Sequence, residues 1–443
     1  MGSEGTIGRL GDYLERVIDN RGKTPPNDTK RTSFELLEVN CLTGSGRRPN
    51  YEVVRKFVTK EAYDSWFRNG HPKTNDVIIS TVGSIGEVCI SEGRGSIAQN
   101  LIALSPKPDA LTGEFLYYYL CSPEVKNELL TLNISSVQPS IKVPHLLDLE
   151  ISLLPLPEQK AIAHILGSLD DKIELNRRMN ATLEGMAQAL FKSWFVDFEP
   201  VIDNALAAGN PIPEELAPRA EVRRQALADG TANREATQAF PAAFKETESM
   251  GWIPEGWEIV AFEDLVAAKQ GRYLAKTEMV NEPDEDHKYP VWGGNGILGY
   301  GPKSAYDRPI TLMTCRGSNC GMIKSTKSSA WVSNNSFACP TKFGSEYFLY
   351  LYFQNENFSE CISGSAQPQI TYTALKNKVM KYPISKEICE TFSESVQVYI
   401  GKIALNEKQN EVLTKLRDTL LPKLISGELR IPEAEQLTEE ALV

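Results

Sequence analysis

The sequence predicts a mixed α/β fold made of two similar halves, each a compact domain followed by a long helix. The segment that begins at Asp170 aligns without gaps, at an offset of 230 residues, with the segment that begins at Ile400. A glycine-rich stretch, a polar amide pair and a Gln-Pro turn precede each copy in the same order. Each copy also carries an apolar seam with heptad-like spacing. We therefore expect a pseudo-twofold internal repeat whose two long helices pair as an antiparallel coiled coil.

The compact part of each half is predicted to contain short strands and one buried helix. β-prone runs bounded by Gly, Pro, Ser and Asn predict the strands. They are DVIISTVG, GEVCIS and NLIALSP in the first half, and PITLMTC, CGMIKS and SFACPT in the second. The aromatic segments FLYYYLCS and YFLYLYFQ predict the buried helices. These elements account for the α/β domain of each half.

The long helices follow from apolar residues at alternating steps of four and three. One seam runs from Ile162 to Trp194 and the other from Phe392 to Leu424. Each helix of about 40 residues would be roughly 60 Å long and would act as a rigid spacer. The chain divides accordingly into a first domain, a first helix, a partly helical linker, a second domain, a second helix and an acidic tail that we expect to be mobile. The boundaries are 1–157, 158–198, 199–250, 251–386, 387–428 and 429–443.

Both seams are interrupted at the same place by a pair of asparagines. A buried Asn costs stability but specifies register, because a shifted pairing leaves its amide unpaired among apolar side chains. Antiparallel pairing about the pseudo-twofold axis brings Asn176 close to Asn410 and Asn180 close to Asn406. The alternative is that these asparagines lie at a solvated edge of the seam.

The common sequence traces of catalysis are absent. The chain has no phosphate-binding G-x-x-x-x-G-K-[ST] loop, no G-x-G-x-x-G motif and no N-P-P-[YF] tetrapeptide. Its four histidines have no partnered nucleophile, and its eight cysteines form no C-x-x-C pair, so we interpret the cysteines as reduced core thiols. We expect no catalytic residue and no bound metal. No secretory segment or apolar run of about 18 residues occurs, which favours a cytoplasmic protein.

Local charge is more informative than the net charge of −11. Residues 21–60 contain nine basic and four acidic side chains, and residues 300–343 contain six basic side chains and one acidic one. Basic side chains neutralise phosphates, and Arg, Asn and Gln can make paired hydrogen bonds to base edges. Each half is therefore predicted to carry a surface that binds double-stranded DNA.

The candidate DNA-binding residues are the basic, amide and hydroxyl side chains in or near the shared motifs. In the first half they are Arg21, Lys23, Arg47, Arg48, Ser84, Gln99, Asn100 and Gln138. In the second half they are Arg272, Arg316, Ser318, Asn319, Asn334, Asn335, Gln367 and Gln369. Structural alternatives stay open for each motif. The glycines can serve only as tight turns, the Gln-Pro segments can only start a strand, and a basic run can be a solvated face.

Three strings carry a resemblance to a known family. They are LPLPEQKAIAHILGSLDDKIELNRRMNATLEGMAQALFKSWFVDF, FPAAFKETESMGWIPEGWEIV and TLLPKLISGEL. The chain resembles, over essentially its whole length, the DNA specificity subunit of type I restriction-modification systems. The resemblance implies two target recognition domains, separated by two long helices conserved in the family, that read a split and asymmetric DNA sequence. The recognition domains vary within the family, so it assigns no base-contacting residue.

The resemblance also implies the partners and their cofactors. Two modification subunits would use S-adenosylmethionine to methylate adenine, and two restriction subunits would use ATP and Mg²⁺ for cleavage. The chain itself would be non-catalytic and would bind no cofactor. The alternative functions are a scaffold or assembly protein, or an orphan specificity subunit without an active DNA-targeting role. A self-contained modifying enzyme would need a cofactor motif that the sequence lacks.

Overall fold

The β-prone runs of the first half form one antiparallel sheet. In sheet order its strands are β2 (Leu14–Ile18), β8 (Leu101–Pro106), β5 (Thr74–Ser80) and β6 (Val88–Glu92). The central strands are buried on both faces, as their continuous apolar runs require. The predicted aromatic helix is α2 (Gly113–Cys121), whose N-cap Thr112 accepts a hydrogen bond from the Phe115 amide, and α2 packs on β5 and β6.

The second half repeats this arrangement strand for strand. Its sheet has the order β13 (Lys269–Gln270), β19 (Ser336–Cys339), β16 (Thr311–Thr314) and β17 (Ile323–Ser325). The helix α9 (Glu346–Gln354) begins at the N-cap Ser345 and packs on β16 and β17, as α2 packs on β5 and β6. The predicted strands and both buried helices are confirmed.

Smaller sheets also recur in the same order. A three-stranded sheet combines one antiparallel and one parallel pair in each half, and a two-stranded antiparallel sheet accompanies it. In the first half these strands are β4 (Lys56–Phe57), β3 (Glu35–Leu37) and β7 (Ser96–Ile97), with β1 (Thr6–Arg9) and β9 (Glu150–Leu153). In the second half they are β15 (Gly296–Gly301), β14 (Tyr289–Gly293) and β18 (Trp331–Val332), with β12 (Trp257–Ala261) and β22 (Val379–Pro383).

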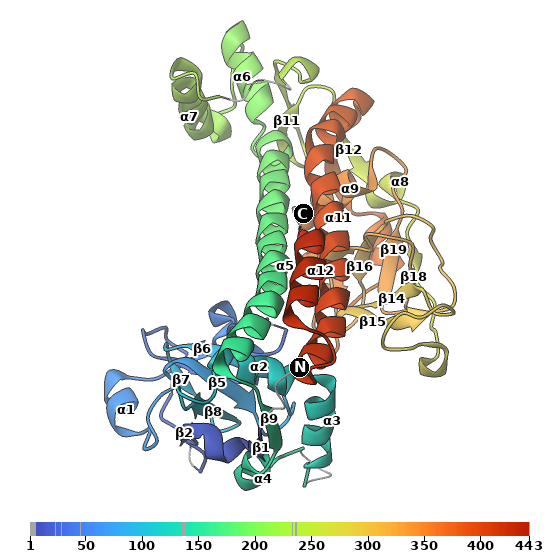
Figure 1. Ribbon diagram of the computed structural model, residues 1–443. Helices are drawn as coiled ribbons and strands as arrows, with labels where there is room; N and C mark the ends of the chain where they lie inside the picture. The colour runs from blue at the N-terminus through green and yellow to red at the C-terminus, as the bar shows by residue number, and fades with distance from the viewer. Residues whose placement is uncertain are drawn as a thin grey trace. The chain divides into compact units, whose positions relative to one another are not determined.

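This computed structural model describes residues 6–22, 24–27, 29–44, 46–134, 139–232, 234 and 237–442. The chain forms two compact units (Figure 1). Unit 1 comprises Met1–Asn180 and Ala404–Val443, and unit 2 comprises Ala181–Ile403. The long helices are α5 (Leu156–Phe191), followed by a π-helical turn at Lys192–Val196, and α11 (Lys386–Ile425), and both pass from one unit into the other.

Each unit has its own core around parts of these helices. In unit 1, Leu166 and Leu169 of α5 pack with Leu420 and Leu424 of α11 and with Phe115 of α2. Unit 2 is aromatic, and the ring centroid of Phe191 lies 5.5 Å from that of Phe348 and 5.6 Å from that of Phe392. The apolar seams read from the sequence therefore form the buried faces of the helices.

The linker and the C-terminal segment contain further helices. The linker includes α6 (Glu199–Ala208), α7 (Ala217–Ala228) and a hairpin of β10 (Phe244–Thr247) and β11 (Gly251–Pro254). The expectation of a mobile tail is wrong, because residues Ile431–Leu442 form helix α12 with Ala434 and Thr438 buried. Apolar residues at helical spacing pack on the unit 1 core, while the acidic side chains occupy the other face.

The cysteines and helices bear on two further expectations. Six of the eight cysteines are buried, in agreement with core thiols. No helix in the described part of the chain combines the length and apolar character that crossing a bilayer requires.

Candidate nucleic-acid interface

In unit 2, three loops meet at one junction held by backbone hydrogen bonds. The loop after β16 contains Cys315 and Gly317, the amide pair precedes β19, and the Gln-Pro segment leads into β21 (Gln369–Ile370). The Cys315 amide donates to the Asn335 carbonyl at 2.8 Å, and the Gly317 amide donates to the Pro368 carbonyl at 3.0 Å. The Ile370 amide donates to the Cys315 carbonyl at 3.0 Å. Gly317 has a φ of 91°, a conformation that favours glycine.

This junction gathers seven of the predicted DNA-binding residues, which lie up to 53 positions apart in the sequence. Arg316, Ser318, Asn335, Gln367 and Gln369 are exposed, and Asn319 and Asn334 are half-buried. Within the described part of the chain no carboxylate pairs with Arg316. The junction thus presents an uncompensated guanidinium and several amides, which are the groups that read base edges.

The structure adds three polar residues that the sequence did not single out. Gln270 donates to the Asn334 carbonyl at 2.8 Å, and Asn295 accepts from the Asn319 amide at 2.7 Å. Lys324 donates to the Gly294 carbonyl at 3.1 Å, and burial lowers the pKa of its ammonium. Of these three residues, only Lys324 could have been found from the sequence, because it belongs to the basic segment 300–343. Gln270 and Asn295 belong to no motif.

Unit 1 builds the same junction with the same three bonds. The Thr81 amide donates to the Asn100 carbonyl at 3.0 Å, the Gly83 amide to the Pro139 carbonyl at 2.8 Å, and the Ile141 amide to the Thr81 carbonyl at 2.9 Å. Ser84 and Gln99 are exposed on it, and Asn100 is half-buried. Gln138 lies outside the described residues. The glycine, amide and Gln-Pro motifs therefore form a recurrent loop scaffold, beyond a simple turn or strand start.

The remaining predicted residues lie away from the junctions or are engaged elsewhere. Arg21 is exposed and pairs with Asp19 at 2.7 Å, and Lys23 lies outside the described residues. The Arg47 side chain is only 15% exposed and pairs with Asp171 of α5. Burial disfavours its charge, yet Tyr118 and Asp171 hold the pKa of Arg47 above the usual value.

Among the described residues, neither Arg48 nor Arg272 pairs with a carboxylate. The Arg48 guanidinium donates to the Ser91 carbonyl at 3.4 Å. Arg272 is exposed, and its carbonyl accepts from the Trp331 indole at 2.9 Å. Within the described ranges, neither guanidinium has a hydrogen bond to the three loops of the junction of its unit.

The four asparagines of the helix seams lie in the predicted pairs, all within unit 1. The Asn176 amide donates to the Asn410 side chain at 2.8 Å and to Gln409 at 3.0 Å. The Asn406 amide donates to Asn180 at 2.8 Å. Asn176 and Asn406 are 3% and 1% exposed, so the solvated-edge alternative is wrong for these two residues.

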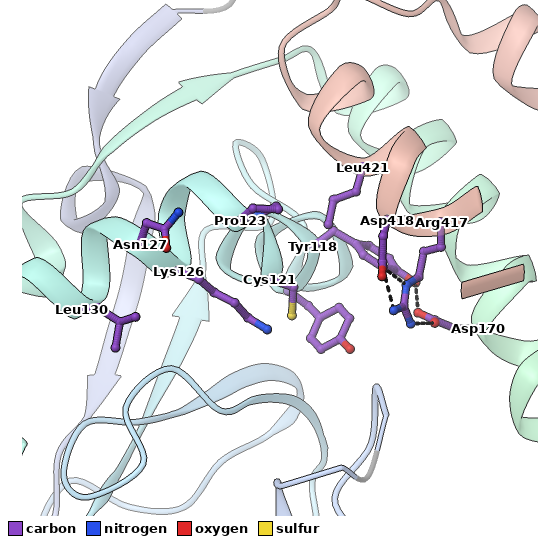
Figure 2. Close-up of a pocket in the computed structure, with 11 residues that line it drawn as sticks. Tyr118, Cys121, Pro123, Lys126, Asn127, Leu130, Asp170, Arg417, Asp418 and Leu421 are labelled. Carbon is purple, nitrogen blue, oxygen red and sulfur yellow. Dashed lines mark hydrogen bonds and ion pairs between the residues drawn. The ribbon is translucent and has the colours of Figure 1, made fainter. Parts of the chain in front are cut away.

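A second polar cluster of unit 1 lies further along the same two helices and contains Asp170 and Arg417. Arg417 of α11 pairs with Asp170 of α5 at 2.7 Å, and the Tyr118 hydroxyl donates to Asp170 at 2.7 Å (Figure 2). Arg417 also pairs with the neighbouring Asp418 at 2.7 Å. Burial disfavours the guanidinium charge, but Asp170 keeps the pKa of Arg417 above its ordinary value. In the lining of the cavity at this cluster, Tyr118, Asp170, Arg417 and Asp418 bond to one another, which indicates a structural role for these four residues.

Comparison with known families explains why the junction occurs twice. Residues 42–185 and 254–415 both match the family model described as the type I restriction modification DNA specificity domain. The chain belongs to the type I restriction-modification DNA specificity family. Its role is therefore sequence recognition on DNA as a specificity subunit, and a scaffold without a DNA role is not favoured.

Individual specificity subunits resemble the chain over most of their length. The HindI specificity subunit of Haemophilus influenzae is 27% identical over 375 residues, covering 75% of this chain and 81% of that protein. The MjaIX specificity subunit of Methanocaldococcus jannaschii is 27% identical over 396 residues, covering 87% and 85%. The crystal structure of the type I restriction-modification S subunit from M. genitalium shares the fold, with a TM-score of 0.51, 17% identity and 95% of each chain covered.

Proposed function

We propose that the chain reads a bipartite, asymmetric DNA target, with one segment read by the junction of each unit, and directs adenine methylation and cleavage by partner subunits. The observation that carries this proposal is the recurrence of one three-bond loop scaffold with different side chains. Thr81, Val82 and Gly83 in unit 1 correspond to Cys315, Arg316 and Gly317 in unit 2. Two equivalent scaffolds with unlike side chains suit a target with two unlike half-sites.

The chemistry of the junctions supports direct reading of base edges. Arginine and glutamine each offer planar, paired hydrogen-bonding groups that match guanine or adenine in the major groove. Basic side chains of each unit supply the sequence-independent attraction to phosphates. The acidic net charge is compatible with this role, because binding depends on the local electrostatic field at the DNA-facing surface.

The internal repeat supports two copies of a modification subunit. Leu175 of α5 and Leu405 of α11 occupy equivalent places in the repeat and are 53% and 64% exposed. The recurrence of an exposed leucine at equivalent places of the repeat favours a surface that binds a partner, and two equivalent surfaces would bind two copies. Two restriction subunits would join this core complex for cleavage.

In this proposal the chain is non-catalytic and binds no cofactor of its own. S-adenosylmethionine belongs to the modification subunits, and ATP and Mg²⁺ belong to the restriction subunits. The complex acts in the cytoplasm, where its DNA lies. The alternative is an orphan specificity subunit without an active DNA-targeting role.

Genome-wide sequencing of adenine methylation tests this function. The chain is expressed in a host together with its modification subunit, and the matched control expresses the modification subunit alone. We expect a new split motif, methylated only when the chain is present, which reveals both half-sites and their spacing. An assembled complex that adds no methylated motif would overturn the proposal in favour of the orphan or scaffold alternatives.

A further inference from the structure

The junctions of the two units contain one pair of facing residues at the same structural position. In unit 2 this pair is Arg316 and Gln369, and in unit 1 it is Val82 and Ser140. Each pair forms an isolated antiparallel bridge between the glycine loop and the Gln-Pro segment. The two pairs are equivalent because the same backbone hydrogen bonds flank them in both units.

The pattern of those bonds determines how the paired side chains are placed. In both units the backbone bonds join the residues on either side of the pair, from Gly317 to Pro368 and from Ile370 to Cys315 in unit 2. The facing residues are therefore a non-hydrogen-bonded pair, in which side chains approach most closely and leave the same face of the ladder. The two side chains of each pair act together as one small surface.

The backbone beneath each pair is held independently of the pair's side chains. All three bonds of the junction are between main-chain groups, so the residues at the paired positions can change without removing any of them. The glycine that follows the first member has a φ of 91° at Gly317 and 85° at Gly83, so both loops turn in the same way. The position is thus suited to carry different side chains on an unchanged scaffold.

The side chains at the paired positions differ completely between the two units. Arg316 and Gln369 are both exposed, and each ends in a planar group with paired hydrogen-bonding atoms. Val82 and Ser140 are half-buried and offer two methyl groups and one hydroxyl. A guanidinium matches the O6 and N7 acceptors of guanine, an amide matches N6 and N7 of adenine, and an apolar side chain matches the methyl group of thymine.

We propose that the facing pair is the position at which each unit selects a base, so that unit 2 reads guanine through Arg316 with an adjacent adenine through Gln369, and unit 1 reads thymine through Val82. This inference rests on the proposed function and deepens it by naming the bases. The pair that faces across the junction determines which bases are accepted, and the surrounding scaffold only presents it.

Exchange of the pair between the units provides the test. The chain is expressed with its modification subunit as wild type, as Arg316→Ala with Gln369→Ala, and as Val82→Arg with Ser140→Gln. Arg224→Ala is the matched control, since Arg224 is a 58% exposed arginine of unit 2 that pairs with Glu221 on α7. Methylated motifs are read by sequencing, base by base, for both half-sites.

We expect the alanine pair to lower the preference for guanine, and for the adjacent adenine, by about 10-fold or more at each position of one half-site, with the other half-site unchanged. The transplanted pair should create a guanine preference at a position of the other half-site that accepts thymine in the wild type. The untouched half-site in each motif reports that the variant is folded and assembled. The control should methylate the wild-type motif.

Each contrary outcome has a separate meaning. A wild-type chain that directs no split motif overturns the proposed function. A wild-type motif that both double variants leave unchanged, or that they weaken evenly at all positions, overturns the inference while the function stands. A changed base in the wrong half-site would overturn the assignment of the pairs to their units.

Discussion

At the residue scale, polar side chains replace apolar ones at a few positions inside the helix pair. Asn176 and Asn406 are almost fully buried, yet each has a hydrogen-bonding partner on the opposite helix. Leucine at these positions would bury more apolar surface, but it would also accept a shifted pairing equally well. The asparagines therefore exchange some stability for a defined register.

The asparagine pair gives a prediction about stability and register. We expect Asn176→Leu alone to destabilise unit 1 by about 1–3 kcal/mol, because Asn410 loses a buried partner. Adding Asn410→Leu should return the stability to the wild-type level or above it, because both polar groups are then removed. Thermal unfolding followed by circular dichroism compares the single, double and wild-type chains. A crystal structure of the double variant with one unchanged register would contradict the register role.

The Asp170–Arg417 pair breaks the internal symmetry of the chain. At the offset of 230 residues, Asp170 corresponds to Ile400 and Arg417 corresponds to Ala187, both in the apolar core of unit 2. At the equivalent positions, unit 2 therefore packs apolar side chains where unit 1 has an ion pair. The ion pair in unit 1 joins α11 to α5 and, through the hydroxyl of Tyr118, to α2.

This comparison predicts the effect of removing the ion pair. Arg417→Ala should destabilise unit 1 by about 3 kcal/mol, because it leaves the largely buried carboxylate of Asp170 without its main partner. Asp170→Ile with Arg417→Ala copies unit 2 and should recover most of that loss. Tyr118→Phe added to the double variant removes the remaining unpaired hydroxyl. Calorimetric unfolding measures the series, and a single variant as stable as wild type would show that the pair contributes nothing.

At the element scale, α5 and α11 have both a buried face and exposed apolar side chains. The buried seam accounts for the pairing of the helices, but Leu175 and Leu405 lie outside it and remain exposed. An exposed leucine alone is ordinary on a protein surface. Its recurrence at equivalent positions of a repeat is what suggests a shared partner.

The exposed leucines predict loss of assembly on substitution. Leu175→Lys or Leu405→Lys should each weaken binding of one modification subunit, and the double variant should bind neither copy. Folding should be unaffected, since both side chains are more than half exposed. Val222→Lys is the matched control, as Val222 is 62% exposed on α7. Light scattering of the purified complexes gives the stoichiometry, and two copies retained by the double variant would exclude these residues from the interface.

At the scale of the whole molecule, the repeat places the same fold in two units, each of which we propose to recognise one half-site. Sheet order, the parallel and antiparallel pairs, the capped helix and the three-loop junction all recur. In the proposed function, the continuous helices α5 and α11 set the gap between the half-sites. The bases that are read and the distance between them are then controlled by separate parts of the chain.

Lengthening both helices tests that separation of roles. Seven residues inserted after Asn180 in α5 and seven after Ile403 in α11 keep the seam in phase and add about 10 Å of helix. We expect the gap between half-sites to grow by about three base pairs, at about 3.4 Å per base pair, with the bases unchanged. An insertion in only one helix should abolish methylation, because the seams no longer match. Methylation sequencing that finds the original gap in the doubly extended chain would contradict the spacer role.

Much of the molecule could be predicted from sequence patterns alone. The repeat, the strands, the buried aromatic helices and the asparagine pairing all follow from local periodicity and self-comparison, because burial of one face imposes a regular spacing on the residues. The family followed from long shared strings. The tail was mispredicted because its acidic residues hid an apolar face that becomes stable only against the core of unit 1.

Only the tertiary structure decided which polar residues act together. Arg316 and Gln369 are 53 positions apart, and no local pattern marks them as neighbours, but a backbone bridge places them face to face. Arg47 and Arg316 look alike in the sequence, yet one is paired with Asp171 on α5 and the other is exposed without a described carboxylate partner. The spacing of nearby residues determines where helices and strands form. A recognition surface instead forms where loops that are distant in the sequence meet. The sequence therefore determined the architecture and the class of protein, and the fold decided which side chains are available to read DNA.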